Sequence, residues 1–312
     1  MECVFNQLES VVNDLPEFPV DSRRVFHGRG HSYPDLEFLS IDLFDPVLVV
    51  TFFTPPPVKW EEPFIVQFKK ITKSTRIEAI QLQRRYLKGA PSETIYGTLP
   101  DEIFAHRGNQ RFQLKLGTRQ NVGFFLDMEP GRAWLEKQCE GKSVLNLFAY
   151  TCTFSVVALG AGARSVFNND MASGAINQGR KNHRLNNLDP RRATFFDGNV
   201  FKSWGRLKTQ APYDLLVIDP PSHQPGSFVA KKDYPKVIKR IPQLLRPGGE
   251  ILASLNAPEL GFEYFKEMFT EASPSCTFVE RLSPSTDFPD IDPERQLKLL
   301  VFRYEPDESN HK

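Results

Sequence analysis

The sequence predicts a doubly wound α/β domain with a seven-stranded, Rossmann-like sheet, preceded by a small α+β domain. After residue 140, short apolar segments alternate with longer helix-compatible ones, as in parallel strands joined by right-handed crossover helices. Before residue 118, strand-like segments dominate and a single helical pattern interrupts them. The chain has 312 residues, which suits two domains of ordinary size. We therefore expect domains at residues 1–118 and 119–312.

The first domain is expected to contain four strands and one helix. Residues 37–43, 47–53, 64–68 and 112–116 are rich in aromatic and aliphatic side chains and read as strands. In the segment 76–87 the apolar residues are separated by polar and basic ones, which we interpret as a helix. Strands packed around one helix predict a small α+β domain, to which we assign RNA or substrate binding.

The second domain alternates strands and helices along the chain. The predicted strands are 143–148, 164–168, 192–196, 214–218, 250–255, 277–282 and 297–304. The predicted helices are 154–160, 172–186, 231–245 and 259–271. No helix separates the last two strands, so we expect the final strand to be antiparallel to the others.

The composition indicates a soluble protein of ordinary type. Hydrophobic residues make up 40% and charged residues 25% of the chain, and 39 basic residues nearly balance 38 acidic ones. With a net charge of +1, any binding to RNA must come from a local patch. The apolar segment 47–53 is far shorter than the roughly 20 residues of a membrane helix. We expect a cytoplasmic protein without membrane contact, and the oligomeric state stays open.

The four cysteines exclude two classes of site. They are widely separated and form no CxxC pair, which argues against a disulfide framework and against a cysteine zinc site, and suits a reducing cytosol. His27 and His31 flank Gly28-Arg29-Gly30, but two histidines without a third ligand do not predict a metal site. We expect them to be structural or to face RNA, and we expect no metal.

Acidic residues follow three successive strands of the second domain. Asp170, Asp197 and Asp219 come directly after the second, third and fourth strands, where ligands of doubly wound sheets bind. Asp170 and Asp197 could instead cap the following helices. Asp170 lies 24 residues after Asn146, close to the interval of about 20 residues seen for acids that bind a ribose. Because the loop after Asn146 lacks a glycine-rich fingerprint, a dinucleotide is disfavoured, and S-adenosylmethionine fits better.

Five segments then resemble, in order, the cofactor motifs of class I S-adenosylmethionine-dependent methyltransferases. They are VLNLFAYTCTFSVVALGAGA, FNNDMA, NHRLNNL, FFDGNVFKSW and YDLLVIDPPSH. More narrowly they are similar to the bacterial 23S rRNA large-subunit methyltransferases I and K/L, whose motifs read N-L-F-x-Y-T-G and D-P-P-x-F. QNVGFFLD resembles that group's Q-K-T-G-x-F-L-D segment. Cys152 stands where the group has glycine, Asn121-Val122 replaces Lys-Thr, and His223 replaces phenylalanine.

The resemblance implies a set of residues around S-adenosylmethionine. Asn146, Phe148 and Tyr150 would shape the methionine side of the pocket, Asp170 would hold the ribose, and Asp197 the adenine edge. The full set implied for the cofactor is Phe125, Asp127, Asn146, Phe148, Tyr150, Thr151, Asp170, Met171, Asp197, Gly198 and Asp219. Phe125 and Asp127 would cover the site.

We predict that the base that accepts the methyl group lies beside four catalytic residues, Asp219, Pro220, Pro221 and His223. Two prolines stiffen the backbone, and the Asp219 carboxylate and Pro220 carbonyl can accept hydrogen bonds from a base amine. His223 could stack on a base. Asn256, in Ser254-Leu255-Asn256, could lie beside the target or cap the next helix.

Methylation at carbon 5 of a pyrimidine would need a nucleophilic thiolate instead. Cys139, Cys152 and Cys276 do not follow the fourth or fifth strand, where such a cysteine is expected. We therefore favour a nitrogen acceptor, with a cytosine C5 methyltransferase as the alternative.

Two clusters of basic residues are candidate RNA contacts or simply solvated surface. The first comprises Lys69, Lys70, Lys73, Arg76, Arg84, Arg85 and Lys88, and the second comprises Lys231, Lys232, Lys236, Lys239 and Arg240. The leading hypothesis is an RNA base methyltransferase whose partner is 23S rRNA or a precursor of the large subunit. A methyltransferase with a non-RNA acceptor, a non-catalytic assembly factor and a nicotinamide-dependent oxidoreductase are the alternatives, and the absent glycine fingerprint opposes the last.

Overall fold

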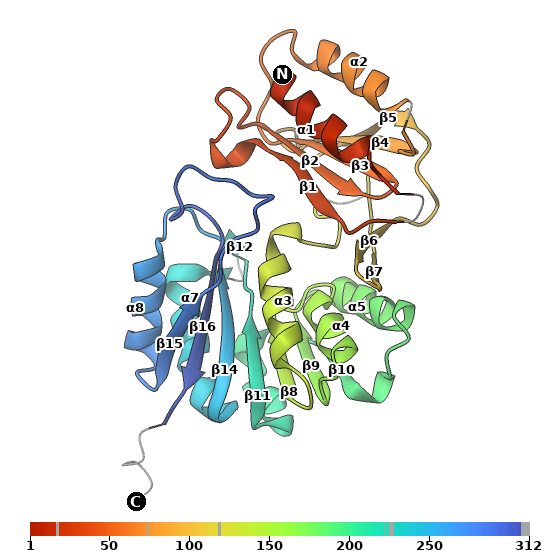
Figure 1. The fold of residues 1–312 in the computed structure, drawn as a ribbon. Coiled ribbons are helices and arrows are strands. Elements are labelled where there is room, and N and C mark those ends of the chain that lie inside the picture. Colours follow the sequence, from red (N-terminus) through yellow and green to blue (C-terminus); the bar gives the residue numbers. More distant parts are fainter. Residues whose placement is uncertain (17–18, 74, 118–119, 222, 225–227, 307–312) are drawn as a thin grey trace, which may run out of the picture. The chain divides into compact units, whose positions relative to one another are not determined.

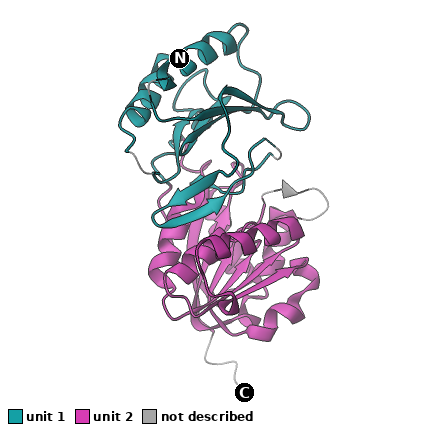
Figure 2. Ribbon diagram, turned by 90° about the vertical axis from the view of Figure 1, so that its right-hand side faces the viewer, with its two compact units in different colours: residues 1–126, 285–291 teal, residues 127–284, 292–312 magenta. Residues whose placement is uncertain are grey.

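A computed structural model describes all residues except 17–18, 74, 118–119, 222, 225–227 and 307–312. It divides the chain into two compact units (Figure 2). Unit 1 comprises Met1–Leu126 and Ser285–Ile291, and unit 2 comprises Asp127–Pro284 and Asp292–Lys312. Among the described residues, no helix combines the length and the apolar character that crossing a bilayer requires.

Unit 1 is built on a five-stranded sheet in the order β1-β2-β3-β4-β5 (Figure 1). The strands are β1 (Arg23–His27), β2 (Leu39–Phe44), β3 (Val47–Phe52), β4 (Ala79–Arg84) and β5 (Ser92–Gly97). Only the β3–β4 pair is parallel among these neighbours. The unit also contains α1 (Glu2–Val12), the 3-10 turn η1 (Gly28–Gly30), α2 (Glu61–Thr72) and a hairpin of β6 (Phe104–Arg107) and β7 (Gln110–Gln113).

The core of unit 1 lies between the sheet and its two long helices, which run on the same side of it (Figure 1). Leu8 of α1 and Phe64 and Phe68 of α2 pack against Ile41 and Val50 of the strands. Alternate strand residues point to opposite faces, so Ile41, Val50 and Leu82 share this side of the sheet.

Two elements predicted for the first domain were wrong. The segment 64–68 lies in helix α2, because Phe64, Phe68 and Ile71 recur at the spacing of one helix face and all are buried. The segment 76–87 contains strand β4, where Ile80 and Leu82 alternate with glutamines. This period of two is typical of a strand, and it outweighs the helix propensity of the polar residues in between.

Unit 2 contains a seven-stranded sheet in the order β10-β9-β8-β11-β14-β16-β15, which confirms the predicted doubly wound fold. Its strands are β8 (Ser143–Leu147), β9 (Ser165–Asp170), β10 (Ala193–Asp197), β11 (Tyr213–Ile218), β14 (Leu245–Leu255), β15 (Cys276–Arg281) and β16 (Lys298–Tyr304). Its helices are α3 (Glu129–Gln138), α4 (Thr153–Gly160), α5 (Ser173–Leu185), α6 (Trp204–Leu207), α7 (Ala230–Ile238) and α8 (Phe262–Ala272). Short 3-10 turns are η2 (Leu126–Met128, which spans the unit boundary), η3 (Pro190–Arg192), η4 (Val200–Lys202), η5 (Lys208–Gln210) and η6 (Ile241–Gln243), and β12 (His223–Gln224) pairs with β13 (Phe228–Val229).

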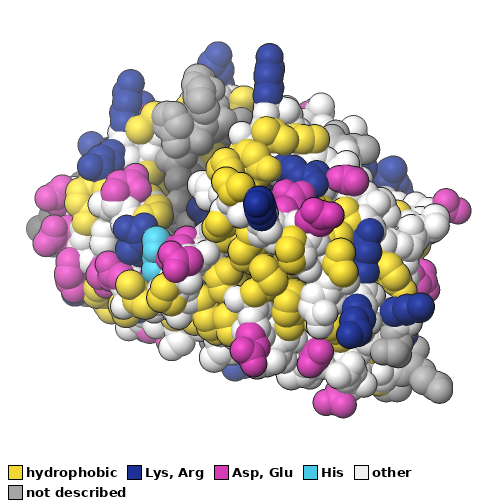
Figure 3. Space-filling model, turned by 90° about the horizontal axis from the view of Figure 1, so that it is seen from above, with side chains coloured by type: hydrophobic (Ala, Val, Ile, Leu, Met, Phe, Trp, Pro, Cys, Tyr) yellow, Lys and Arg dark blue, Asp and Glu magenta, His cyan; other side chains and the backbone are white. Residues whose placement is uncertain are grey.

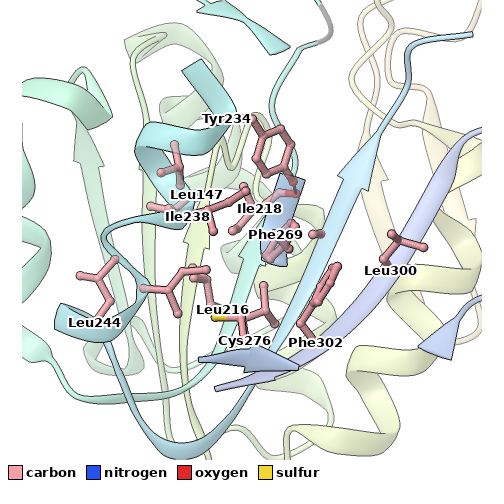
Figure 4. Close-up of a cluster of buried hydrophobic side chains, with 14 of the residues drawn as sticks. Leu147, Leu216, Ile218, Tyr234, Ile238, Leu244, Phe269, Cys276, Leu300 and Phe302 are labelled. Atoms are coloured by element: carbon pink, nitrogen blue, oxygen red, sulfur yellow. Dashed lines mark hydrogen bonds between the residues drawn. The ribbon is translucent and has the colours of Figure 1, made fainter. Parts of the chain in front are cut away.

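The last strand, β16, lies between β14 and β15 and is antiparallel to both, as predicted. Helices α7 and α8 cover one face of the sheet, and α3 and α4 cover the other. Figure 4 shows the first of these cores, in which Tyr234, Ile238 and Phe269 point toward the strands. Phe269 and Phe302 stack with ring centroids 3.8 Å apart, which ties α8 to the inserted strand.

Candidate functional site

The carboxyl ends of five parallel strands, β10, β9, β8, β11 and β14, form one edge of the unit 2 sheet. In register, Asp197 of β10 lies opposite Asp170 of β9, and Ile218 of β11 lies opposite Leu147 of β8. From β8 the chain continues to β9 and then β10 on one side of β8. It then returns to form β11, which pairs with the other side of β8. Ligands of doubly wound sheets bind where the winding reverses, so the segments after β8 and β11 flank the candidate site.

The loop after β8 has an alternating left-handed backbone. Phe148, Tyr150 and Cys152 have φ angles of 59°, 48° and 61°. Each left-handed residue other than glycine costs about 1 kcal/mol, so surrounding contacts must hold this shape. The Tyr150 amide donates to Asp170 Oδ2 at 2.8 Å, and the Ala149 amide donates to the Asn169 carbonyl at 2.9 Å. The second strand thus fixes the loop that follows the first.

Asp170 anchors two backbone segments at once. Its Oδ2 accepts from Tyr150, and its Oδ1 accepts from the Ala172 amide at 2.8 Å, just before helix α5. Burial raises the pKa of this carboxyl, and the two amides oppose that rise. Asp170 is not the N-cap of α5, since Ala172 occupies that position, and its carboxylate keeps lone pairs beyond the two that these amides use. Asp197, by contrast, is exposed.

A buried polar network lies under this loop. The Asn146 side-chain amide donates to Asn168 Oδ1 at 3.0 Å, and the Asn168 amide donates to Ser155 Oγ at 3.0 Å. His183 Nδ1 lies 2.7 Å from the Gly179 carbonyl, which can only accept, so His183 Nε2 receives the Ser155 hydroxyl at 2.8 Å. Burial lowers the pKa of His183 to about 4, which keeps the ring neutral.

The network leaves one buried oxygen available. Asn146 is 1% exposed, and its Oδ1 has no hydrogen-bond partner among the described residues. A buried polar atom without a partner is costly, so a ligand donor reaching this end of β8 would be favoured.

Asp219 occupies the corresponding position after β11. Burial raises the pKa of its carboxyl to about 7; the hydroxyl of Ser254, which donates to Asp219 Oδ1, opposes the rise. The nearby Asp127 and Asp170 raise it further, whereas Arg132 lowers it. Asp219 therefore changes its charge near neutral pH, which is uncommon for a carboxyl group and typical of functional sites.

Tyr234 contacts the backbone next to Asp219. Its hydroxyl lies 3.2 Å from the Ile218 carbonyl and 3.1 Å from the Ser254 carbonyl, and the side chain is fully buried. It therefore links the ends of β11, which Asp219 follows, and β14, which contains Ser254.

The remaining residues of the Asp-Pro-Pro segment differ in exposure. Pro220 is buried and Pro221 is exposed. His223 pairs through its backbone with Val229, but its side chain lies outside the described residues, as does Ser222. The predicted stacking role of His223 stays a prediction.

Other residues predicted to contact the cofactor lie around the same edge. Thr151 is buried, and Met171 is 50% exposed directly after Asp170. The Gly198 amide donates to the Asp170 carbonyl at 3.0 Å, and a Cβ there would lie 2.4 Å from the Phe196 ring. A side chain at Gly198 would therefore displace Phe196.

Phe125 and Asp127 fall on opposite sides of the unit boundary. Phe125 belongs to unit 1 and is exposed, whereas Asp127 begins unit 2 and acts electrostatically on Asp219. The covering role of these two residues stays a prediction.

Sequence reasoning missed Arg132 on helix α3. Its side chain is 1% exposed, and its Nε donates to Glu129 at 3.0 Å. It shares a buried helix face with Leu135 and Cys139, three and seven residues further on, and an arginine at such a position was the available signal.

The cysteines do not have the surroundings of a nucleophile. Cys139, Cys152 and Cys276 are buried, and burial raises the pKa of each thiol. A catalytic thiolate needs the opposite shift.

The basic clusters are partly neutralised. Arg76 pairs with Asp45, Arg84 pairs with Glu61, and Lys236 pairs with Asp233 on α7. On the face shown in Figure 3, the visible Lys and Arg side chains stand among acidic and apolar ones. Any contact with RNA would therefore involve smaller groups of basic residues than the two full clusters.

The fold and the acid-lined strand edge define a Rossmann-like methyltransferase domain. A family described as S-adenosylmethionine-dependent methyltransferase matches residues 23–303, and the chain belongs to this family. Its cofactor is S-adenosylmethionine.

Curated relatives carry more specific names. The ribosomal RNA large subunit methyltransferase I of Shewanella amazonensis is 28% identical over 263 residues, which cover 80% of this chain and 66% of the relative. The K/L enzyme of Shewanella loihica is 33% identical over 192 residues, 60% of this chain and 26% of the relative. The chain thus spans slightly under two thirds of the first of these proteins. A solved methyltransferase structure from Streptococcus mutans has the same fold, with a TM-score of 0.85 at 22% identity over 97% of this chain and 80% of that one.

Proposed function

We propose that this protein transfers a methyl group from S-adenosylmethionine to a base nitrogen of large-subunit ribosomal RNA. The names of the curated relatives support the choice of RNA. The observation that carries the choice of nitrogen is the half-buried Asp219, which is followed by two prolines and accepts a hydrogen bond from Ser254 at the strand edge. The partner would be 23S rRNA or a large-subunit precursor.

The residues at the edge fit the cofactor. S-adenosylmethionine, when bound, supplies an already activated methyl group. Asn146 offers a buried oxygen suited to an amino group, and Asp170 offers further lone pairs to ribose hydroxyls. Phe148, Tyr150 and Thr151 would shape the methionine side, and Met171, Asp197 and Gly198 the adenine side.

The acceptor base would lie against the Asp-Pro-Pro segment. The Asp219 carboxylate and the Pro220 carbonyl accept hydrogen bonds from a base amine, which orients the nitrogen lone pair toward the methyl group. The base nitrogen would gain the methyl group as the sulfur–methyl bond of the donor breaks and S-adenosylhomocysteine is left. The nitrogen would then lose a proton, which the Asp219 carboxylate, with a pKa of about 7, can receive. His223 would stack on the base.

The alternative reaction at carbon 5 of cytosine has weaker support. It needs a thiolate that adds to the ring, and the three buried cysteines have raised pKa values.

Substituting Asp219 tests the proposal. With radiolabelled S-adenosylmethionine and undermethylated ribosomal RNA, we expect Asp219→Asn to lower the rate about 100-fold, because the amide cannot take up the proton. S-adenosylhomocysteine affinity, measured by calorimetry, should change far less. Asp189→Asn is the matched control, since Asp189 pairs with Arg191 on the exposed surface.

Nucleoside mass spectrometry of the product decides the acceptor atom. A base methylated on nitrogen is the expected result. Formation of 5-methylcytidine, or an unchanged rate for Asp219→Asn, would overturn the nitrogen mechanism, and methyl transfer to protein alone would overturn the RNA assignment.

A further inference from the structure

Two segments of unit 2 carry an excess of basic residues. The segment 198–213, which contains η4 and α6, has the bases Lys202, Arg206 and Lys208 and no acid. The segment 230–240, which contains α7, has five bases and a single acid, Asp233. Together they contain eight basic residues and one acidic residue, in a chain whose net charge is only +1.

Aromatic rings of the first segment contact basic side chains of the second. Lys236 Nζ lies 5.7 Å from the centre of the Phe201 ring, and the Arg240 guanidinium carbon lies 5.6 Å from the centre of the Trp204 ring. These cation–π contacts place η4 and α6 beside α7, so the two segments form one surface. We call it the α6–α7 surface, and its exposed basic residues are Lys202, Arg206, Lys208, Lys232, Lys236 and Lys239.

Helix α7 presents a row of lysines on the side away from the core. Its buried residues include Tyr234 and Val237. Lys232, Lys236 and Lys239 are spaced by four and three residues, so they lie along one face of the helix, and all three are exposed. Lys232 and Lys239 are about 10 Å apart along the axis at 1.5 Å per residue. Charges spread over this length suit an extended polyanion better than a single small anion.

Most of these ammonium groups are available to a partner. The Asp233 carboxylate accepts the Lys236 ammonium at 2.7 Å and the Val229 amide at 2.8 Å. Lys236 thus keeps two of its three donors. The side chains of Lys202, Lys232 and Lys239 form no hydrogen bond or ion pair with another residue that the structure describes.

The positive charge ends at the neighbouring helix α8. This helix carries one lysine and three exposed glutamates, Glu263, Glu267 and Glu271. Lys231 lies on the α8 side of α7, with its Nζ 5.8 Å from the centre of the Tyr264 ring. The α6–α7 surface is therefore a local patch, not part of a uniformly charged face.

The α6–α7 surface adjoins the candidate site. The Phe228 ring, just before α7, lies 6.3 Å from the Phe201 ring and 5.3 Å from the ring of Phe148 in the loop after β8. The Tyr234 hydroxyl of α7 lies 3.2 Å from the carbonyl oxygen of the residue before Asp219. A polymer with one unit bound beside Asp219 would therefore pass close to this surface.

We propose that the α6–α7 surface binds the phosphate backbone of the RNA substrate beside the target base. This rests on the proposed function, because RNA is the polyanion that the reaction brings to unit 2. Lysines bind phosphates as point charges, and binding releases counterions from the RNA. The half-buried rings of Phe201 and Trp204 hold two of the cations in position, which reduces the entropy lost on binding.

The double variant Lys232→Gln/Lys239→Gln tests the surface, and both side chains are exposed, so it should fold normally. Binding of a fluorescein-labelled single-stranded RNA of mixed sequence is followed by anisotropy across a KCl series. We expect binding to weaken about tenfold, and the slope of log K against log[KCl] to become shallower by about 0.7 for each lost phosphate contact. Lys232→Arg/Lys239→Arg keeps both charges and should bind like wild type.

Lys137→Gln/Lys181→Gln is the matched control, because it removes two exposed lysines of unit 2, on α3 and α5, and the same net charge. S-adenosylhomocysteine affinity should not change in any of these variants, which checks that unit 2 is folded. Equal weakening by the control pair would show that overall charge sets the affinity, and the α6–α7 surface would be wrong.

The outcomes separate this surface from the proposed function. If wild-type protein binds the RNA and Lys232→Gln/Lys239→Gln binds it with the same affinity and slope, the surface is wrong and the proposed function stands. If the variant alone weakens RNA binding but wild-type protein methylates no RNA, the surface stands and the proposed function fails. Failure of wild-type protein to bind the RNA would overturn the surface, and methylation of ribosomal RNA would then decide the proposed function by itself.

Discussion

Asp219 is a half-buried carboxyl group directly after β11, where we propose that a base amine binds. The carboxyl accepts the Ser254 hydroxyl and lies near Asp127 and Arg132, so its ionisation depends on several neighbours. A carboxylate whose pKa lies near neutral pH is a stronger base than an ordinary aspartate and exchanges a proton more readily during a reaction. The chemistry of this site is therefore expected to depend on pH.

The rate of methyl transfer should rise with pH through about 7, because Asp219 must be ionised to accept a proton. The pH dependence of stability has the opposite sign. The folded-state pKa of Asp219 is raised above 3.8, so between pH 4 and 7 the native state keeps a proton that the unfolded state has lost. The free energy of unfolding contributed by this group therefore falls as pH rises over that range.

Urea unfolding of wild type and Asp219→Asn from pH 4.5 to 8 measures this effect. As pH rises, the free energy of unfolding of wild type should fall relative to that of Asp219→Asn, which lacks the titrating carboxyl group. The surface control Asp189→Asn should not reproduce the shift, since hydrogen bonds from Arg191 lower the pKa of Asp189 to about 2. A pH-independent difference for Asp219→Asn would contradict the raised pKa.

The Cys152 side chain packs against Gly179 and leaves no room for a larger residue there. A Cβ at Gly179 would lie 2.4 Å from the Cys152 sulfur, so Gly179→Ala should destabilise the fold by about 1–3 kcal/mol. In a Cys152→Gly background the sulfur is gone, and the same alanine should cost at least 1 kcal/mol less. Thermal or urea unfolding of the four members of this cycle provides the measurement. Additive effects would show that the alanine is accommodated in another way.

At the scale of elements, the polar network joins strands β8 and β9 to helices α4 and α5. Ser155 connects Asn168 with His183, and all three side chains are buried. The network holds the Asn146 amide so that its Oδ1 stays available at the end of β8. This explains why polar residues occupy positions that an apolar core would otherwise fill.

Ser155→Ala should destabilise the protein by about 1–3 kcal/mol, because it leaves buried polar groups of Asn168 and His183 unsatisfied. S-adenosylhomocysteine affinity should also fall as Asn146 loses its fixed orientation. Thr209→Ala is the control, since it removes an exposed hydroxyl that donates to the Arg206 carbonyl. A stable variant with normal affinity would show that the network is not needed to orient Asn146.

The elements of unit 2 were predicted more accurately than those of unit 1. Strands buried on both faces are short, continuous apolar segments, and helices between them must be long enough to cross over. In unit 1, α2 and β4 both contain mixed apolar and polar residues. Only the spacing of a few apolar residues distinguishes helix from strand in these segments. Helix α1 was also not predicted, although Val4, Leu8 and Val12 are spaced by four residues.

At the scale of the whole molecule, the chain returns to unit 1 after unit 2 has begun. Ser285–Ile291 belongs to unit 1, where the Ile291 amide donates to the Gly30 carbonyl at 2.9 Å. The Phe288 ring lies 4.5 Å from the Arg24 guanidinium carbon and 5.1 Å from the His27 ring. The units are therefore not two independent stretches of sequence.

Phe288→Ala should weaken the β1 edge of unit 1 by about 1 kcal/mol, because contacts with Arg24 and His27 are lost. Hydrogen exchange followed by mass spectrometry should show faster exchange in Arg23–His27 than in wild type, while β3 and β4 stay protected. Val279→Ala, an exposed residue of unit 2, provides the comparison. Unchanged exchange in β1 would show that Phe288 does not hold this edge.

The sequence by itself determined the doubly wound sheet, its antiparallel last strand, the family and the cofactor, because periodicity and short ordered motifs are local properties of the chain. The tertiary structure decided what depends on distant residues meeting. It raised the pKa of Asp219 through burial, placed the Ser254 hydroxyl on that carboxyl group, buried Arg132, and linked Asn146 to His183 through Asn168 and Ser155. It also brought Lys236 to the Phe201 ring, 35 residues away in sequence. Electrostatic and packing energies depend on distances in space, which no spacing along the chain records.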